Sequence, residues 1–297
     1  MKIRIYALLF AFVFLGACAE DKEIGKIQVP GMDYTLPQGG DAAADERVME
    51  LLKTYDSYFV YDFSEKDFEW TQIGGSLGDD VYRFDPIEPS KVSTLLDLLQ
   101  TTWLDFYDKD FLKKAMPIRV FLAGNVQLRV EEWSWITWEY EYTWKDIPAR
   151  YLDNQIAVGY MGKTVAEMSG WAKREYKSYL QATFLEYCLS SGLITIPEEF
   201  YALSDYTGNL FWESSEVARE AGFVYNPADD IEWSTEYDLS RFEDATAYLA
   251  SLVYRTTEEW AADLEYPLIR KKYDILVNWL EKQYGIDVCK IGNTVYE

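Results

Sequence analysis

The sequence predicts an α+β fold, because strand patterns gather in the first half of the chain and helix patterns in the second. From residue 126 to residue 158, aromatic and apolar residues mostly recur two positions apart, which is the period of a β-strand. From residue 165 onward they recur three or four positions apart, as along one face of a helix. Strands and helices segregated in this way are typical of α+β domains, whereas alternation would indicate a parallel α/β sheet.

The first half contains both kinds of element. Apolar residues at helical spacing predict helices at residues 45–59 and 91–106, with a short helical segment at 111–115. The apolar run at 118–122 predicts a buried strand. Residues 67–72 alternate as a strand does, and the glycines that follow end the pattern.

The second half is expected to be almost wholly helical. Helical spacing predicts helices at residues 165–189, 197–204, 214–221, 239–254, 257–264 and 267–283. We therefore expect a domain at residues 45–297, with a strand-rich part at about 60–160 packed on a helical part at about 165–288. A chain of this length can bury a substantial core.

The N-terminus has the features of a lipoprotein signal peptide at residues 1–17. Lys2 and Arg4 precede an apolar run that is too short to span a bilayer. The run ends in Leu-Gly-Ala-Cys, which looks like a bacterial lipobox, so we expect cleavage before Cys18 and acylation of its thiol and new amine. An ordinary secretory signal with a chance cysteine is the alternative.

Residues 18–44 are expected to form a lipid-anchored, flexible tether, because they are polar and contain several prolines and glycines. The charged run at 19–23 resembles the tag that sends some Gram-negative lipoproteins to the outer cell surface, although a solvated tether has the same composition. We therefore expect a protein anchored to the outer membrane through Cys18 and facing the cell exterior.

The composition excludes several classes of function. The chain has 51 acidic and 28 basic residues, a net charge of −23, and such a field repels nucleic acids and anionic lipids. It contains no histidine, which excludes His-ligated metal sites and nucleophiles activated by histidine. Beyond Cys18 only Cys188 and Cys289 remain, and they could pair in an oxidising exterior or stay as buried free thiols.

Several short segments, taken in their order and spacing, resemble a known family. They are residues 91–107 and 110–114, Pro-Glu-Glu-Phe at 197–200, Tyr-Thr-Gly-Asn at 206–209, Gly-Phe-Val at 222–224, and residues 279–287. Together they resemble the substrate import-associated zinc metallohydrolase lipoproteins, over about residues 46 to 288. The resemblance implies a zincin-like fold with zinc as the cofactor. It also implies the motif H-E-x-x-H on a helix, about ten residues before Pro-Glu-Glu-Phe.

In that motif, histidines at positions i and i+4 share a helix face and bind one zinc ion, and the glutamate between them activates the zinc-bound water. The matching segment of this chain has Leu185 and Leu189 at the two ligand positions, and Glu186 at the position of the general base. We therefore expect a degenerate metal site without bound zinc, in which Glu186 is a carboxylate on a helix face.

A second acidic motif of the family, E-D-F-x-E, corresponds to residues 243–247. Glu243 and Asp244 remain, and the last acid is replaced by Ala247. A rebuilt site could combine Cys188 with Glu186, Glu243 and Asp244, because thiolates bind zinc and carboxylates suit calcium or manganese. However, Cys188 directly precedes the second ligand position and so projects about 100° away from it on the helix, which favours a buried structural cysteine. Glycosidases that work with two carboxylates are a further alternative, but no single pair of acids stands out.

The aromatic stretch between residues 133 and 144 is the candidate ligand-binding surface. Its large rings are Trp133, Trp135, Trp138, Tyr140, Tyr142 and Trp144. Exposed rings of this kind stack on sugars or hold apolar side chains, and the interleaved glutamates could orient hydroxyl groups. The same stripe also fits packing beneath the helical half, which is the fate of most aromatic stripes.

These expectations combine into one function. The chain is expected to be a non-catalytic, substrate-binding or accessory lipoprotein of a TonB-dependent nutrient importer, beside a glycan-binding lipoprotein, as the resemblance implies. Its ligand would be a glycan or a peptide, and neither a cofactor nor nucleic acid is expected. The alternatives are an active hydrolase, with a rebuilt metal site or a carboxylate pair, and a structural subunit with a large exposed apolar patch.

Overall fold

The computed structural model describes residues 34–69, 81–163, 165–208, 210, 214–227 and 240–297. Contacts divide the chain into two units, Met1–Thr35 and Leu36–Glu297, and only the last two residues of the first unit are described. The expected signal peptide, Cys18 and most of the expected tether therefore lie outside the described residues. In the part that is described, no helix is long and apolar enough to cross a membrane. All the elements described below belong to the second unit.

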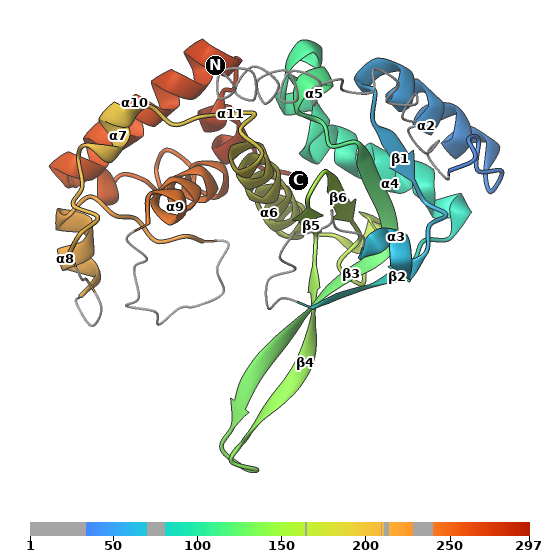
Figure 1. The fold of residues 1–297 in the computed structure, drawn as a ribbon, viewed down its shortest axis with the longest axis horizontal. Helices are drawn as coiled ribbons and strands as arrows, with labels where there is room; N and C mark the ends of the chain where they lie inside the picture. Colours follow the sequence, from blue (N-terminus) through green and yellow to red (C-terminus); the bar gives the residue numbers. More distant parts are fainter. Residues whose placement is uncertain (1–33, 70–80, 164, 209, 211–213, 228–239) are drawn as a thin grey trace, which may run out of the picture. The chain divides into compact units, whose positions relative to one another are not determined.

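The α+β fold class is confirmed, with strands in the first half of the chain and helices dominating the second (Figure 1). The first half contains α2 (Ala42–Tyr55), β1 (Tyr58–Val60), α3 (Glu65–Phe68), β2 (Tyr82–Pro86), α4 (Pro89–Thr102), η1 (Leu104–Phe106), α5 (Lys109–Ala115), β3 (Arg119–Ser134), β4 (Glu139–Ile147), β5 (Ala149–Leu152) and β6 (Gln155–Val158). The second half contains η2 (Val165–Glu167), α6 (Gly170–Ser190), α7 (Glu198–Tyr201), α8 (Ser215–Glu220), α9 (Arg241–Tyr254), η3 (Asp263–Glu265), α10 (Pro267–Tyr284) and α11 (Val288–Asn293).

The sheet is organised by the long strand β3. Its first residues pair in parallel with β1 on one side and β6 on the other, and β5 adds to β6 antiparallel. Its later residues pair antiparallel with β2 and β4. The register shifts where these two parts of β3 meet, beside Gly124. A Cβ atom on Gly124 would lie 2.7 Å from the Pro86 carbonyl oxygen, so this close approach needs glycine.

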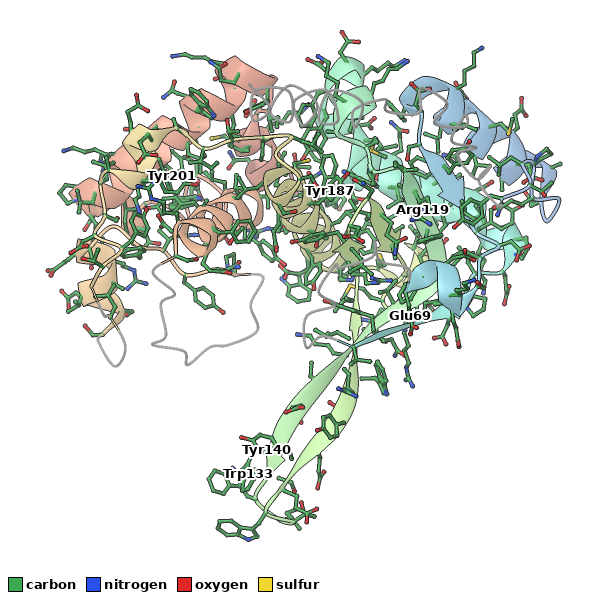
Figure 2. All side chains as sticks on the ribbon, viewed as in Figure 1. Glu69, Arg119, Trp133, Tyr140, Tyr187 and Tyr201 are labelled. Atoms are coloured by element: carbon green, nitrogen blue, oxygen red, sulfur yellow. The ribbon has the colours of Figure 1, made fainter. Side chains whose placement is uncertain are left out.

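Beyond Arg129, β3 pairs with β4 alone among the described residues, and the two strands form a ribbon (Figure 1). The register runs from Val126 opposite Ile147 to Ser134 opposite Glu139. Trp133 and Tyr140 lie near the end of this ribbon (Figure 2). A ribbon with only two strands cannot bury both of its faces, so its side chains remain largely exposed.

One expected strand, at residues 67–72, is wrong where the structure describes it. Asp67 and Phe68 belong to the short helix α3. The Ser64 side chain accepts a hydrogen bond from the Asp67 backbone, and the Asp67 carboxylate accepts one from the Ser64 backbone at 2.9 Å. This reciprocal cap satisfies two N–H groups at the helix start, which favours a helical turn over an extended strand.

Helix α6 joins the two halves of the fold. It begins at the cap residue Ser169 and packs against α4, β5 and α9. Phe184 is fully buried and lies edge-on to Trp103 at 5.1 Å and to Tyr107 at 5.2 Å between ring centroids. Burial of one such ring contributes roughly 2–3 kcal/mol. Gln181, also buried, donates to the Thr102 carbonyl at 2.8 Å and so satisfies the end of α4.

Capping residues, a proline and a glycine determine where the later helices begin and end. Ser240 caps α9, Pro267 occupies the first turn of α10, and Gly285 ends α10 in the left-handed conformation at φ 69°. Proline is tolerated in the first turn because its missing N–H would be unpaired there, and glycine adopts positive φ without strain. This is why the predicted helices at residues 239–254 and 267–283 agree closely with α9 and α10.

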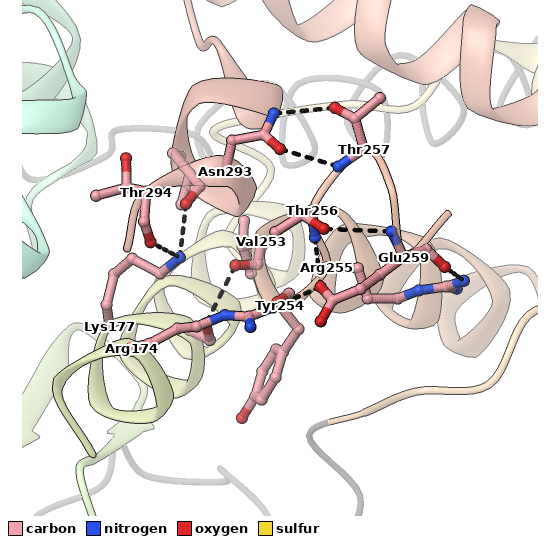
Figure 3. A network of polar contacts seen from close by, with 12 residues as sticks. Arg174, Lys177, Val253, Tyr254, Arg255, Thr256, Thr257, Glu259, Asn293 and Thr294 are labelled. Atoms are coloured by element: carbon pink, nitrogen blue, oxygen red, sulfur yellow. Dashed lines mark hydrogen bonds and ion pairs between the residues drawn. The ribbon is translucent and has the colours of Figure 1, made fainter. Parts of the chain in front are cut away.

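A polar network fixes the C-terminal segment on α6 and α9 (Figure 3). Arg174 of α6 donates to the Tyr254 carbonyl at 3.0 Å and forms an ion pair with Glu259. The Lys177 side chain is fully buried, and its Nζ donates to the Ile291 carbonyl at 2.6 Å and the Thr294 carbonyl at 3.3 Å. The lysine thereby caps carbonyl groups at the end of α11, where the Ile291 carbonyl also accepts from the Thr294 backbone N–H at 3.3 Å.

We expect the buried Lys177 to make stability depend on pH. Burial lowers the pKa of Lys177 to about 8, whereas a lysine in an unfolded chain titrates near about 10.4. Between these values the unfolded chain binds a proton that the folded chain has released, so this contribution to stability rises with pH. From pH 7.5 to pH 9.5 the free energy of unfolding of the wild type, relative to Lys177→Met, should rise by about 2 kcal/mol. Urea titrations of both proteins at the two pH values measure this, and a difference that does not change with pH would contradict it.

Candidate functional site

The two positions at which the resemblance implies zinc-binding histidines, Leu185 and Leu189, lie on α6 and pack in the apolar core. Leu185 is fully buried, and Leu189 is half-buried and packs against the same core. An aliphatic side chain has no lone pair to offer a metal ion. Both positions therefore contribute to packing and can make no metal–ligand bond.

Glu186, at the position of the general base, lies half-buried on α6 beside β5. The Tyr151 hydroxyl donates a hydrogen bond to Glu186 Oε1 at 3.0 Å. Burial and the negative charge of Glu186, with a smaller effect from Glu243, raise the pKa of Tyr151, so the tyrosine stays a protonated donor at neutral pH. Glu186 and Glu243 thus act on the same tyrosine, and the fold brings these two expected residues into one neighbourhood.

Asp244 makes different contacts from its neighbour Glu243. Its carboxylate is completely buried, and its Oδ2 atom accepts hydrogen bonds from Lys272 Nζ at 2.7 Å and from the Tyr206 hydroxyl at 2.5 Å. Ala247, one helical turn further along α9, is buried in the core. The acidic motif therefore faces two environments, because Glu243 is exposed near Tyr151 whereas Asp244 lies in the interior.

Lys272 of α10 is the fully buried cation that pairs with Asp244. Four aromatic rings surround its ammonium group, at centroid distances of 4.8 Å for Phe200, 5.7 Å for Tyr206, 4.8 Å for Phe223 and 5.4 Å for Tyr248. We call this arrangement the lysine box. The negative faces of the rings stabilise the ammonium ion where water cannot reach it.

Burial dominates the electrostatics of the lysine box. It raises the pKa of Asp244 and lowers the pKa of Lys272, while the opposite charge of each partner works against these shifts. Charges removed from water are tolerated only when they are paired closely. Asp244 consequently stays paired with Lys272 and hydrogen-bonded to Tyr206.

These residues do not fit a zinc ion. Zinc needs three or four nitrogen, sulfur or oxygen ligands in a tetrahedral arrangement. The corresponding positions supply Leu185, Leu189, Ala247 and an Asp244 already paired with lysine. Among the described residues, no group of three or more Cys, Asp and Glu side chains could hold a metal ion.

The two cysteines of the described chain take part in no such site. Both are free thiols, so the disulfide alternative is wrong. Cys188 is fully buried in the core, and burial raises the pKa of its thiol. A thiol that stays protonated in an apolar environment is a poor metal ligand, which agrees with a structural role for Cys188.

The aromatic stretch is the most exposed apolar surface of the described chain. The exposed fractions are 40% for Trp133, 74% for Trp135, 67% for Trp138, 62% for Tyr140, 58% for Tyr142 and 36% for Trp144. Packing of this stripe beneath the helical half is therefore wrong. The alternation along each strand was predicted, but nothing in the residue pattern indicated that this stripe would lie on a ribbon away from the helices.

Pairing of β3 with β4 joins the rings into one continuous surface, which we call the aromatic face. Trp133 lies directly opposite Tyr140, with 5.1 Å between ring centroids, and both are labelled in Figure 2. Trp135 lies edge-on to Trp133 at 6.3 Å and to Trp138 at 5.9 Å. The cross-strand register thus places rings from both strands on one face of the ribbon.

Two arginines that the sequence analysis did not single out complete the aromatic face. The Arg129 guanidinium lies 4.8 Å from the centre of the Tyr142 ring, and that of Arg83 lies 4.2 Å from the centre of the Trp144 ring. Trp138 has a positive φ of 58°, which is unfavourable for a bulky residue by roughly 1–2 kcal/mol. The ribbon thus tolerates backbone strain at the point where its turn presents a tryptophan.

Comparison with known proteins identifies the fold of this chain, but it assigns neither a family nor a function. The chain shares its fold with a crystal structure from Bacteroides caccae, described as that of a candidate zinc-binding metallo-peptidase. The two agree with a TM-score of 0.51 and 14% sequence identity, over 87% of this chain and 92% of the other. The protein therefore has a metallopeptidase-like α+β fold. No protein-family model and no curated protein matches the chain.

We expect the lysine box to be essential for stability. Replacement of Lys272 by methionine would leave the Asp244 carboxylate buried without a cation and should lower the free energy of unfolding by about 3–5 kcal/mol. The double variant Lys272→Met, Asp244→Leu removes both charges and should recover most of that loss. Denaturant unfolding of the wild type and both variants measures this, and equal losses in the single and double variants would contradict it.

Proposed function

We propose that this protein is an outer-membrane lipoprotein that binds a glycan or a peptide at the cell exterior for a nutrient-import system and does not cut it. The observation that carries the proposal is the exposed aromatic face. Six large rings on one two-stranded ribbon expose between 36% and 74% of their surface. Large contiguous apolar surfaces on a folded domain mark sites of interaction.

The residues at the hydrolase positions support a non-catalytic role. The shared fold links this chain to a candidate zinc-binding metallo-peptidase. Peptide hydrolysis by such a site needs a metal ion that lowers the pKa of bound water towards about 7. In this chain Leu185 and Leu189 supply packing in place of ligands. Glu186 is hydrogen-bonded to Tyr151, and without those two ligands it would have no metal-bound water to activate.

The cellular context of the proposal comes from the lipobox and from the family resemblance. Acylation at Cys18 would anchor the chain in the outer membrane, with residues 18–44 as its tether. A TonB-dependent importer and its glycan-binding lipoprotein would then be its neighbours. The net charge of −23 suits a domain held away from an anionic membrane surface.

Binding should be lost when the aromatic face is truncated. The Cys18→Ser chain can be screened against immobilised glycans and peptides, alone and with Trp133→Ala, Tyr140→Ala. The matched control is Val130→Ala, Thr143→Ala, a directly opposed pair of residues on the other face of the same ribbon. We expect affinity to fall about tenfold or more for the aromatic pair and to stay unchanged for the control pair.

An assay for hydrolysis tests the alternative that the same protein is an active enzyme. Incubation of the Cys18→Ser chain with the glycans and peptides that it binds, with and without added zinc, should release no product. Cleavage that disappears in Glu186→Ala would show an active hydrolase and refute the proposal. The Glu186→Ala variant should otherwise bind ligand as the parent protein does.

Anchoring is tested separately in a Gram-negative host. The full-length chain should be recovered in the outer-membrane fraction and should incorporate labelled palmitate. The Cys18→Ser variant should incorporate no label and should be released in soluble form. Label that persists in the variant, or a soluble wild-type chain, would show that the N-terminal segment is an ordinary secretory signal.

A further inference from the structure

Residues 139–144 of β4 have one edge without a strand partner among the residues that the structure describes. They pair with β3 on one side, and no described strand pairs with their other side. The residues from Glu139 to Trp144 are exposed. An open edge presents backbone N–H and C=O groups to any extended chain that approaches it.

The two faces of β4 differ in chemistry. Within residues 139–144, Tyr140, Tyr142 and Trp144 alternate with Glu139 and Glu141, so this stretch is aromatic on one face and acidic on the other, and Lys145 lies further along the acidic face. A strand added beside β4 would place alternate side chains against the aromatic rings. Its remaining side chains would lie against the two carboxylates.

The negative charge of the ribbon favours a positively charged partner. Residues 131–141 contain four glutamates and no lysine or arginine. This segment therefore has no cation of its own to neutralise its carboxylates. A partner with basic side chains opposite Glu139 and Glu141 gains favourable cross-strand pairs, whereas an acidic partner or an anionic membrane is repelled.

The ring geometry favours a polypeptide over a sugar chain. The planes of Trp133 and Trp135 meet at 86°, those of Trp135 and Trp138 at 82°, and those of Trp133 and Tyr140 at 71°. A run of flat sugar rings needs aromatic faces that lie nearly parallel. Ile136, which is 92% exposed at the turn, adds aliphatic surface that suits apolar side chains.

We propose that the ligand of the aromatic face is an extended polypeptide segment that adds beside residues 139–144 of β4 as a further strand. Its side chains alternate between large apolar residues, which cover Tyr140, Tyr142 and Trp144, and lysine or arginine, which pair with Glu139 and Glu141. The inference rests on the proposed function and names the ligand class of the same site.

A second copy of this chain does not meet these requirements. Antiparallel pairing of two β4 strands centred on Tyr140 would bring Glu139 against Glu141, and like charges opposite each other are destabilising. In the register centred on Thr143, Glu141 would instead lie opposite Lys145, so the charge of the whole chain is the main obstacle there. The net charge of −23 on each copy adds long-range repulsion. The occupant is therefore a different chain with basic character.

The test uses short synthetic peptides and the Cys18→Ser protein. One peptide alternates tryptophan or valine with lysine, and a second has the same composition with its apolar and basic residues in separate blocks. We expect the alternating peptide to bind about tenfold or more tightly than the block peptide, as measured by calorimetry. Equal affinities would overturn the proposal, because composition alone would then explain binding.

A charge-reversal variant provides a second test of the proposal. The variant Glu139→Lys, Glu141→Lys should lose affinity for the alternating lysine peptide by about tenfold or more and gain affinity for the same peptide with glutamate in place of lysine. The control Thr143→Ala should change neither affinity. Unchanged preference in the reversed variant would overturn the proposal even if the peptide bound.

A glycan, a second copy of the chain or a membrane bound at the same surface would each give a different result. Glycan binding that depends on Trp133 and Tyr140, without peptide binding, would overturn the inference and leave the proposed function intact. Concentration-dependent dimers lost in Tyr140→Ser, Tyr142→Ser would assign the edge to a second copy and overturn it. Binding to phosphatidylcholine vesicles that is lost in the same variant would assign the face to a membrane surface and overturn it as well.

Discussion

The buried ion pair between Lys272 and Asp244 is the constraint on which the helical half depends. Neither charge has access to water, so the surrounding chain must close around both. The rings that do so come from α7, from the segment between α7 and α8, from the segment after α8, and from α9. The pair therefore holds α10 against α9, and the short segments around α7 and α8 pack around it. Since α9 packs on α6, the same interaction secures the helix that spans the two halves of the fold.

This arrangement explains what the family resemblance detected. Three of the segments that carried it contribute Phe200, Tyr206 and Phe223, and each places a ring in the lysine box. These residues are thus part of a packed scaffold, and they say little about catalysis. The residues that would carry catalysis are those at the helix positions of Leu185 and Leu189, where this chain has aliphatic side chains. The core and the lysine box are built from side chains of this chain, so the scaffold does not depend on histidines at positions 185 and 189.

The sequence predicted the fold class and the long helices because caps and apolar spacing act locally. It failed at residues 67–69, where the cap between Ser64 and Asp67 outweighs a short alternating pattern. It also could not show that Lys272 would be buried, since a lysine that directly follows Arg270 and Lys271 in an amphipathic helix looks like a surface residue. For the aromatic stripe, a period of two identifies two faces but does not say which of them meets water. That answer depends on β3 extending past β2, and it is a property of strand pairing across the chain.

The ribbon and the helical core can therefore serve separate purposes. The aromatic face is built on β3, whose first residues are held between β1 and β6 and are almost completely buried from Val120 to Ala123. A buried strand that continues into an exposed ribbon gives the ribbon a rigid base, so exposed rings can be held in a fixed order without a core of their own. Because none of these rings belongs to the lysine box or to the neighbourhood of Glu186, changes at the hydrolase positions leave the aromatic face unaltered. Aliphatic residues at positions 185 and 189 are thus compatible with the proposed binding function, which would reside on the ribbon of β3 and β4 with Arg83 of β2 beside it.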